Sequence, residues 1–494
     1  MSGTCFSSLV DLCTSPSERN AARHCPNQAS GELVMPRPKT IAWIAALMAG
    51  AFALLLPALI NGFPFVFADT GGYLARPFER TLALGRSALY GLFLAAGARF
   101  EFWPNIIAQA GLTIWVLHIL LRVYGYHRPL IFAALIMGLS IFTSLPWFVA
   151  QLMPDVFVPL AVIALHLLAF ARERISGIET LLLVVIVALA MAAHMSIVGI
   201  VLGLLLLLAM LRLLHRRLGV ARPLPRNHPA LGVPITAAAT GLLLALGSNF
   251  LIAGQFTLTP GGSTFLFGRL LQDGIVARYL GEHCPDPEIR LCAFRNELPA
   301  SIDDWLWGDG PIGVLGGWEA FEPEGRRIVY RTLAAYPWLY IRTAVRGTAR
   351  QLITLATGEG LGSSDNWHVR DALRQYAPRT TADFAASRQE HDAFDFHMVN
   401  LIHVPMALIA TAMLPVIVVF CWRRNPQLSL FAATVLVAIL ANAAICAIFS
   451  TPNARYQARI VPLAVLTALM LLVDLARSGR ALPSSSAARM HSNA

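Results

Sequence analysis

Long apolar stretches recur along the chain and are separated by short polar ones. A membrane-spanning helix needs about 20 mainly apolar residues, and the stretches that meet or approach this length are residues 40–62, 103–122, 129–148, 155–171, 179–193, 196–212, 232–253, 399–421, 427–449 and 457–476. The turn-like sequence AAHMS favours two short spans over one within residues 179–212, and the lone His194 is interpreted as a turn histidine. The pattern predicts an all-α polytopic membrane protein with about ten transmembrane helices.

Two polar regions are longer than ordinary loops. Residues 63–102 contain the short apolar stretch 83–99, with Arg near both ends, which favours a juxtamembrane helix at the membrane surface. Residues 254–398, between spans seven and eight, are far longer than a usual connection and must carry their own structure. Within them, residues 265–282 and 326–357 have helical spacing.

These features divide the chain into five parts. They are a cytoplasmic tail predicted to be disordered (1–39), an N-terminal membrane domain (40–253), the large segment (254–398), C-terminal membrane helices (399–476) and a second disordered tail (477–494). Met35 precedes the sequence PRPK and offers an alternative start site.

Composition and charge support the membrane interpretation. The chain is 56% hydrophobic and only 13% charged, whereas soluble domains average about 25% charged residues. The net charge of +10 does not indicate nucleic-acid binding, because the arginines cluster at the ends of apolar stretches. Such clusters are typical of topology determinants.

The arginine distribution predicts one orientation. With the N-terminus inside, the short inside loops carry Arg122 and Arg128; Arg172 and Arg174; Arg212, Arg216, Arg217, Arg222 and Arg226; Arg423 and Arg424; and Arg477 and Arg480. This satisfies the positive-inside rule and places both termini in the cytoplasm. The strong use of Arg over Lys is typical of a high-GC bacterial genome, so we expect a bacterial inner membrane. Residues 63–102 and 254–398 would then face the periplasm.

The cysteines fall into three groups. Cys284 and Cys292 lie eight residues apart in a segment expected to face an oxidising compartment, which favours a disulfide over free thiols or a metal pair. Cys421 and Cys446 lie in or at the ends of spans and are expected to be buried. Zinc binding by Cys5, Cys13, Cys25 and His24 is an alternative whose spacing fits no standard pattern, and no metal site is predicted.

Several polar groups are expected to meet at the outer face. They are Asp69, Arg86, Asp155, Arg455, Tyr456 and Arg459. Charged groups near hydrocarbon are costly unless they are paired or hydrated, which makes them functional candidates. Structural alternatives are an Asx-turn at Asp69, a helix cap at Asp155, and headgroup anchoring by the arginines. The arginine- and aromatic-rich residues 326–357 indicate either a face lying on headgroups or a site for a lipid phosphate.

These groups suit glycosyl transfer from a lipid-linked sugar. An acceptor hydroxyl needs a base, which Asp69 could supply, with Asp155 as a second candidate. Charge grows on the departing phosphate, and arginines stabilise such charge with bidentate hydrogen bonds. The lipid lies in the bilayer while the acceptor arrives from water, so a catalytic loop beside the headgroups has the required geometry.

The first outer loop and the last span carry a family pattern. The pattern in the first loop is an acid, a Tyr, an Arg, a juxtamembrane helix and a Gln in the next span. Here these are Asp69, Tyr73, Arg86, the sequence SALYGLFL and Gln109. The sequence ARYQARIVPLAVL begins the last span. This pattern resembles the GT-C superfamily of integral-membrane glycosyltransferases, such as the dolichyl-phosphate-mannose and aminoarabinose types. The resemblance implies a polyprenyl-phosphate-linked sugar donor and an inverting mechanism.

Site roles also follow from the resemblance. Asp69 would be the base or the partner of a divalent metal ion, Arg455 and Arg459 would hold the donor phosphate, and Tyr73, Arg86 and Tyr456 would contact substrate. The chain departs from the pattern because Ser87 and Gly91 replace the usual prolines and no acidic pair occurs at 69–71, which weakens a metal role. The large segment also lies between spans seven and eight rather than at the C-terminus.

Other functions stay open. A transporter or lipid flippase would suit ten spans, but few ionisable residues lie at mid-span, and no inverted repeat is visible. A non-catalytic envelope assembly protein could use residues 254–398 for docking. An acyltransferase is less favoured, because no His-Asp pair lies within the spans. Membrane lipids are expected partners in each case, and nucleic acid is not.

Overall fold

The computed structural model describes residues 38–218 and 230–480. The zinc alternative at Cys5, Cys13, Cys25 and His24, and the alternative start at Met35, lie outside these residues. The chain divides into two compact units, Met1–Ile41 and Ala42–Ala494. The candidate site lies in the second unit.

The described part of the chain is helical, and no β-strand occurs in it, which confirms the all-α prediction. The helices are α1 (Pro38–Asn61), α2 (Ala68–Glu79), α3 (Ala88–Gly97), α4 (Trp103–Val123), α5 (Pro129–Phe142), α6 (Leu145–Val149), α7 (Phe157–Phe170), α8 (Gly177–Ala193), α9 (Met195–Leu218), α10 (Gly232–Ala253), α11 (Gly262–Gln272), α12 (Ile275–His283), α13 (Ile302–Trp307), α14 (Pro311–Val314), α15 (Gly317–Ala335), α16 (Pro337–Ile353), α17 (Trp367–Tyr376), α18 (Thr381–Ala385), α19 (Phe396–Arg424), α20 (Pro426–Phe449), α21 (Ala454–Ala458) and α22 (Pro462–Arg480). An isolated β-bridge joins Phe65 to Gln151.

Seven stretches of helix are long and apolar enough to cross a membrane within the described residues, as expected for a polytopic membrane protein. They are Lys39–Asn61, Trp103–Val123, Met195–Leu213, Gly232–Ala253, Phe396–Arg424, Pro426–Phe449 and Ala454–Ser478. The other three predicted spans are the shorter apolar helices α5, α7 and α8, of 14, 14 and 17 residues. A 14-residue helix is about 21 Å long, less than the ~30 Å hydrocarbon core. The structure therefore supports seven long spans, and the count of ten stays a prediction.

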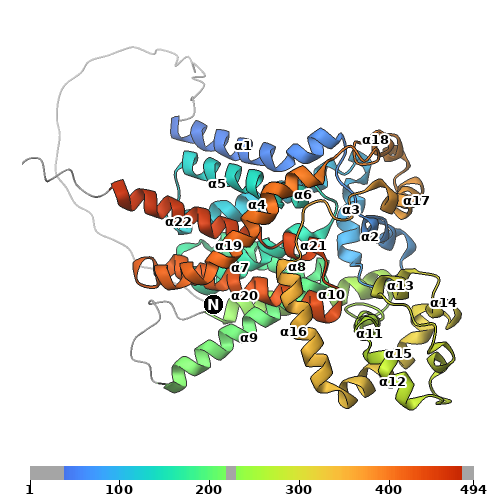
Figure 1. Cartoon of the computed structure of the whole chain (residues 1–494). Coiled ribbons are helices and arrows are strands. Elements are labelled where there is room, and N and C mark those ends of the chain that lie inside the picture. The colour runs from blue at the N-terminus through green and yellow to red at the C-terminus, as the bar shows by residue number, and fades with distance from the viewer. Residues whose placement is uncertain (1–37, 219–229, 481–494) are drawn as a thin grey trace, which may run out of the picture. The chain divides into compact units, whose positions relative to one another are not determined.

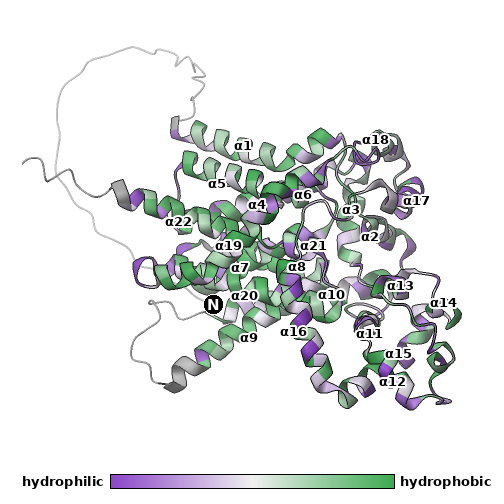
Figure 2. Cartoon of the chain, viewed as in Figure 1, coloured by the Kyte–Doolittle hydropathy of each residue, from purple (hydrophilic) through white to green (hydrophobic). Residues whose placement is uncertain are grey.

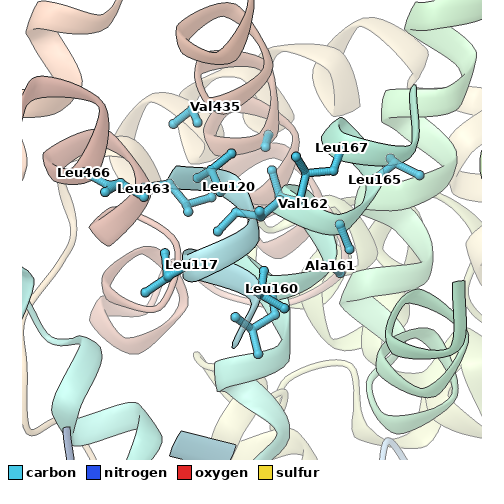
Figure 3. Close-up of a cluster of buried hydrophobic side chains, with 14 of the residues drawn as sticks. Leu117, Leu120, Leu160, Ala161, Val162, Leu165, Leu167, Val435, Leu463 and Leu466 are labelled. Carbon is cyan, nitrogen blue, oxygen red and sulfur yellow. The ribbon is translucent and has the colours of Figure 1, made fainter. Parts of the chain in front are cut away.

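Helix α7 lies inside the bundle of longer helices. Its residues 158–169 are all buried, and a helix that is apolar on every side is expected to be surrounded by protein or lipid. Figure 3 shows the packing, in which leucines of α4 and α7 meet side chains of α20 and α22. The labelled residues are Leu117, Leu120, Leu160, Ala161, Val162, Leu165, Leu167, Val435, Leu463 and Leu466.

The predicted division within residues 179–212 is confirmed. Helix α8 ends at Ala193, His194 is extended with φ −150° and ψ 124°, and α9 begins at Met195. The turn places His194 at the end of the bundle where the candidate site lies.

Shorter, more polar helices gather at one end of α4, α7 and α20. They are α2 from the first loop and α11–α15, α17 and α18 from residues 254–398, and the apolar helix α3 packs against α2 (Figure 1). Figure 2 shows mixed hydrophilic colouring on these helices and hydrophobic colouring on the long ones. A disulfide joins Cys284 to Cys292 just after α12.

The helical spacing predicted for the large segment divides into helix pairs. Residues 265–282 fall in α11 and α12, which are separated at Gly274, where φ is +76°. Residues 326–357 fall mainly in α15 and α16, which meet at Tyr336 and Pro337. Proline cannot donate a backbone hydrogen bond within a helix and often begins a new one.

The sequence DTGGY lies within helix α2, so the Asx-turn alternative for Asp69 is wrong. The side chain of Thr70 accepts a hydrogen bond from the Phe67 amide at 2.9 Å and closes the start of the helix. A Cβ on Gly71 would lie 2.9 Å from the carbonyl oxygen of His368 in α17. Packing against a neighbouring helix therefore explains this glycine.

Gly91 permits a second close approach. A Cβ at this position would lie 2.3 Å from the carbonyl oxygen of Tyr73. Helix α3 therefore packs directly on α2, and a proline or any residue with a side chain would force the two helices apart. This contact gives a structural reason for the departure from the family pattern at Gly91.

A single side chain connects the end of the large segment to the first loop. The Gln389 amide group donates to the carbonyl oxygen of Val66 at 2.8 Å and accepts from its N–H at 3.0 Å. The backbone N–H of Gln389 donates to Asn61 Oδ1 at 2.7 Å. Both backbone polar groups of Val66, just before α2, are thereby bonded to the large segment.

Candidate functional site

Two carboxylate–arginine pairs lie at the polar end of the bundle. The outer pair is Asp69 with Arg86, and the inner pair is Asp155 with Arg459. Arg455 lies near both carboxylates, 3.9 Å from Asp69. The structure thus brings together residues from the first loop, the start of α7 and the start of the last span, as the sequence predicted.

Asp69 is the accessible carboxylate. It lies in the first turn of α2, where its Oδ1 accepts a hydrogen bond from Arg86 Nη2. Its side chain is 25% exposed, whereas that of Arg455 is 8% exposed. Arg86 also donates to the Leu84 carbonyl at 2.8 Å and lies over the ring of Trp307 at 4.9 Å. These contacts fix the carboxylate while leaving part of it open to a substrate.

Asp155 is held in a buried polar network, in which its Oδ1 is bonded and its Oδ2 has no hydrogen-bond partner within the described residues. Arg459 Nη1 donates to Asp155 Oδ1 at 2.9 Å, and both side chains have no exposed surface. Arg459 Nη2 donates to Ser196 Oγ at 2.9 Å and to Asn442 Oδ1 at 3.1 Å. The predicted cap role at the start of α7 is not observed, because the Asp155 side chain makes no cap bond. This burial favours a positioning role for Asp155 over direct contact with substrate.

Arg455 has more unused hydrogen-bonding capacity than Arg459, of which Nε alone lacks a partner within the described residues. Its Nε and Nη1 are buried and make no hydrogen bond within the described part of the chain. The guanidinium lies flat over the Phe67 ring at 3.8 Å, and the Tyr456 ring is 5.3 Å away. Buried donors are normally paired, so this arrangement leaves two donor nitrogens available to an anionic ligand.

Tyr456 stands between the two arginines of the last span. Its ring centre lies 5.3 Å from the Arg455 guanidinium and 5.2 Å from that of Arg459. An aromatic face attracts a cation, which favours both guanidinium groups in these positions. Tyr456 therefore orients the arginines, and its backbone carbonyl accepts from Asn442 Nδ2 at 2.8 Å.

Glu359 from the large segment completes the surroundings of Arg455. Its Oε2 accepts a hydrogen bond from the Arg455 backbone N–H at 2.6 Å. Burial raises the pKa of the Glu359 carboxyl, although hydrogen bonds and the charge of Arg455 oppose this effect. A small pocket beside them, with room for about one water molecule, is lined by Trp147, Phe148, Gln151, Ala356, Thr357, Gly358, Glu359, Leu361 and Arg455.

Tyr73 forms part of the wall behind Asp69. It is 2% exposed and packs edge-on against Tyr90 at 5.2 Å. Tyr90 donates to Gln109 Oε1 at 3.1 Å, and Gln109 Nε2 donates to the Gln151 carbonyl at 2.9 Å. Burial and the neighbouring charge of Asp69 raise the pKa of the Tyr73 hydroxyl well above its ordinary value. Substrate contact, as the resemblance implied, would need this side chain to move.

His194 is linked to the inner pair through one hydroxyl. Its Nδ1 is 3.2 Å from the Ser196 N–H and 2.9 Å from Ser196 Oγ, which also accepts from Arg459. Because the backbone N–H can only donate, Nδ1 is an acceptor and the ring is neutral with its proton on Nε2. Burial and the charge of Arg459 lower the His194 pKa to about 4. The interpretation of a satisfied turn histidine is confirmed.

Metal ligands do not cluster at the site. Within residues 38–218 and 230–480, no group of three or more His, Cys, Asp or Glu side chains is placed to hold a metal ion. The residues present fit an arginine-held anion better than an anion bridged by a divalent cation.

Sequence reasoning missed Phe67, Ser196, Glu359 and Asn442. Asn442 carried a usable signal, because an amide in the middle of an apolar span needs a polar partner. Glu359 lies in the glycine-rich sequence TGEGLG. This sequence predicts a loop, but not that the loop contacts Arg455. Phe67 and Ser196 had no distinguishing signal.

Comparisons of the chain with protein-family models, with curated proteins and with solved structures find no match.

Proposed function

We propose that the chain is a GT-C-like glycosyltransferase that moves a sugar from a polyprenyl-phosphate carrier to an acceptor of the cell envelope. The observation that carries this proposal is the pairing of a partly exposed carboxylate, Asp69, with a buried guanidinium, Arg455, whose Nε and Nη1 are unpartnered. Such a pair suits a reaction in which one group takes a proton and the other stabilises a departing phosphate.

The reaction divides between these two groups. The Asp69 carboxylate accepts the proton of an acceptor hydroxyl, whose oxygen then attacks the anomeric carbon of the donor sugar. The bond from that carbon to the phosphate oxygen breaks, and the electron pair leaves with the polyprenyl phosphate. Arg455 donates Nε and Nη1 hydrogen bonds to the phosphate as its charge grows. Attack opposite to the leaving group inverts the anomeric carbon.

The remaining residues position this pair. Arg86 and Arg455 hold the Asp69 carboxylate from two sides. Asp155 and Arg459 fix the start of the last span, and with it Arg455, from inside the protein. Glu359 fixes the Arg455 backbone from the large segment. The donor phosphate would enter from the pocket beside Arg455, with the lipid chain toward the membrane helices.

The proposed location is the periplasmic face of a bacterial inner membrane, with both termini in the cytoplasm. Arginine-rich short loops on the side opposite the site support this orientation. A lipid-linked donor is reached at this face from the bilayer and an envelope acceptor from the periplasm.

The test is Asp69→Asn in the purified full-length chain. Because a positioned general base contributes about 10²- to 10⁴-fold, transfer of radiolabelled sugar from a polyprenyl-phosphate donor should fall by at least about a hundredfold. Asp383→Asn is the matched control, since Asp383 is exposed on α18. Wild-type turnover by Asp69→Asn would refute the base assignment.

The donor and acceptor are identified by mass spectrometry of envelope glycans and lipids from a deletion strain. The alternative function, a transporter or flippase, predicts that proteoliposomes move labelled lipid without any acceptor. Movement of lipid without sugar transfer would replace the proposal with that alternative. Loss of neither activity on deletion would favour an envelope assembly protein.

A further inference from the structure

Helix α16 presents an exposed apolar face outside the membrane-spanning helices. Four large hydrophobic side chains of this helix are exposed, namely Trp338 (79%), Ile341 (48%), Val345 (64%) and Ile353 (69%). Their spacing of three, four and eight residues places them along one side of the helix. Single exposed hydrophobic residues are ordinary, but a row of four on one helix indicates an interaction surface.

Three arginines lie beside this apolar row. Arg342, Arg346 and Arg350 are spaced four residues apart and are all exposed, and α16 contains no Asp or Glu. They form no ion pair within residues 38–218 and 230–480. The arginines of the preceding helix α15 differ, because Arg326, Arg327 and Arg331 each pair with a carboxylate, among Glu322, Asp286 and Glu288.

The opposite face of α16 is attached to the end of a membrane helix. A Cβ on Gly347 would lie 3.3 Å from the Ala447 side chain near the end of α20. The Gln351 side chain donates to the Asn453 carbonyl at 2.8 Å and accepts from the Asn453 N–H at 2.9 Å. In Figure 1, α16 leaves the bundle beside α20 and α21 and reaches toward α12. The exposed face therefore begins where a spanning helix ends.

We propose that α16 is an interfacial helix whose exposed face binds the anionic phospholipid headgroups of the bilayer. Trp338 and the aliphatic side chains would enter the boundary between headgroups and acyl chains, while the arginines contact lipid phosphates. Unpaired positive charge without any acid on the helix is complementary to an anionic surface. Contact with the end of α20 makes the bilayer the adjacent partner, whereas an acidic protein would have to compete with it. This surface is separate from the Asp69 site and does not depend on sugar transfer.

The test places a fluorophore on α16 of the full-length chain. Val345→Cys is labelled after Cys5, Cys13 and Cys25 are changed to Ser, because Cys421 and Cys446 are buried and Cys284 and Cys292 are joined. The protein is placed in phosphatidylcholine nanodiscs that contain a small fraction of spin-labelled phosphatidylglycerol or of spin-labelled phosphatidylcholine. Each spin label is carried close to the headgroup, and fluorescence quenching is measured.

Each basic residue near an anionic surface contributes about a fivefold preference. Labelled phosphatidylglycerol should therefore quench at least about five times as strongly as the same amount of labelled phosphatidylcholine. The triple variant R342Q/R346Q/R350Q should reduce this ratio to about one. The control R326Q/R327Q/R331Q removes the same charge from α15 and should leave it unchanged. Absence of quenching, or equal quenching by the two lipids in the wild-type chain, would overturn the proposal. Equal loss in both triple variants would also overturn it, because the effect would then follow net charge rather than α16.

Discussion

Removal of one partner of the buried pair between Asp155 and Arg459 should strongly destabilise the fold. Asp155→Ala leaves the Arg459 guanidinium without exposed surface and with only neutral acceptors, Ser196 and Asn442. Breaking a buried pair in this way costs about 3–5 kcal/mol. The two remaining hydrogen bonds favour the lower part of that range, so we expect about 3 kcal/mol.

A double-mutant cycle separates the pair from its surroundings. Arg459→Met alone leaves the buried Asp155 carboxylate without a hydrogen-bond partner, with Arg455 as the nearby cation, and should cost a similar free energy. The double variant Asp155→Ala/Arg459→Met removes both charges, so its cost should fall at least about 2 kcal/mol below the sum of the single variants. Free energies of unfolding are measured in mixed detergent micelles by reversible SDS titration.

An exposed pair provides the control for this cycle. Asp371 and Arg374 lie 2.9 Å apart on α17, with side chains 63% and 69% exposed. The corresponding variants there should change stability by about 0–1 kcal/mol. If Asp155→Ala costs less than about 1 kcal/mol, or if the two single costs simply add, the inner pair does not carry the free energy that its burial implies.

Two further substitutions and conditions test other parts of the structure. Gly91→Ala should cost about 1–3 kcal/mol, because its Cβ would lie 2.3 Å from the Tyr73 carbonyl oxygen. Gly111→Ala is the control, because no atom lies within 4 Å of the added Cβ and α4 should not be destabilised. Thermal unfolding checks both variants, and equal melting temperatures would contradict the close packing of α2 and α3. The His194 pKa of about 4 lies below the ordinary value of about 6.5, so the neutral ring favours the folded state above pH 6.5 and that contribution is lost as the pH falls toward 4. His194→Gln should therefore flatten the fall in melting temperature between pH 6.5 and 4, and an unchanged pH profile would show that another group is responsible.

The membrane helices could be predicted from the sequence because their signal is local. Twenty apolar residues in a row indicate a span without knowledge of its neighbours. The shortness of α5 and α7 could not be predicted, because apolar composition continues into the neighbouring turns. Helix α8, in contrast, was expected to be a short span. For α7, burial on all sides compensates for its length.

The sequence could predict which residues meet at the candidate site, but not which arginine pairs with which carboxylate. Alternation of spans places Asp69, Asp155 and Arg455 at the same end of the bundle, which the structure bears out geometrically. The choice of Arg459 for Asp155 depends on contacts between residues 304 positions apart. The helical state of Gly71 also depends on distant residues, because close packing with α17 overrides the cost of glycine in a helix.

The hydrogen bonds between Gln389 and Val66 couple the local unfolding of two distant parts of the chain. The α2 segment cannot swing outward while both polar groups of Val66 remain bonded to the Gln389 amide. Asn61, at the end of α1, accepts a hydrogen bond from the Gln389 backbone N–H. Release of the loop that carries Asp69 therefore requires the last part of the large segment to detach with it. The two would exchange their amide hydrogens as a single cooperative unit, although more than 300 residues separate them in the sequence.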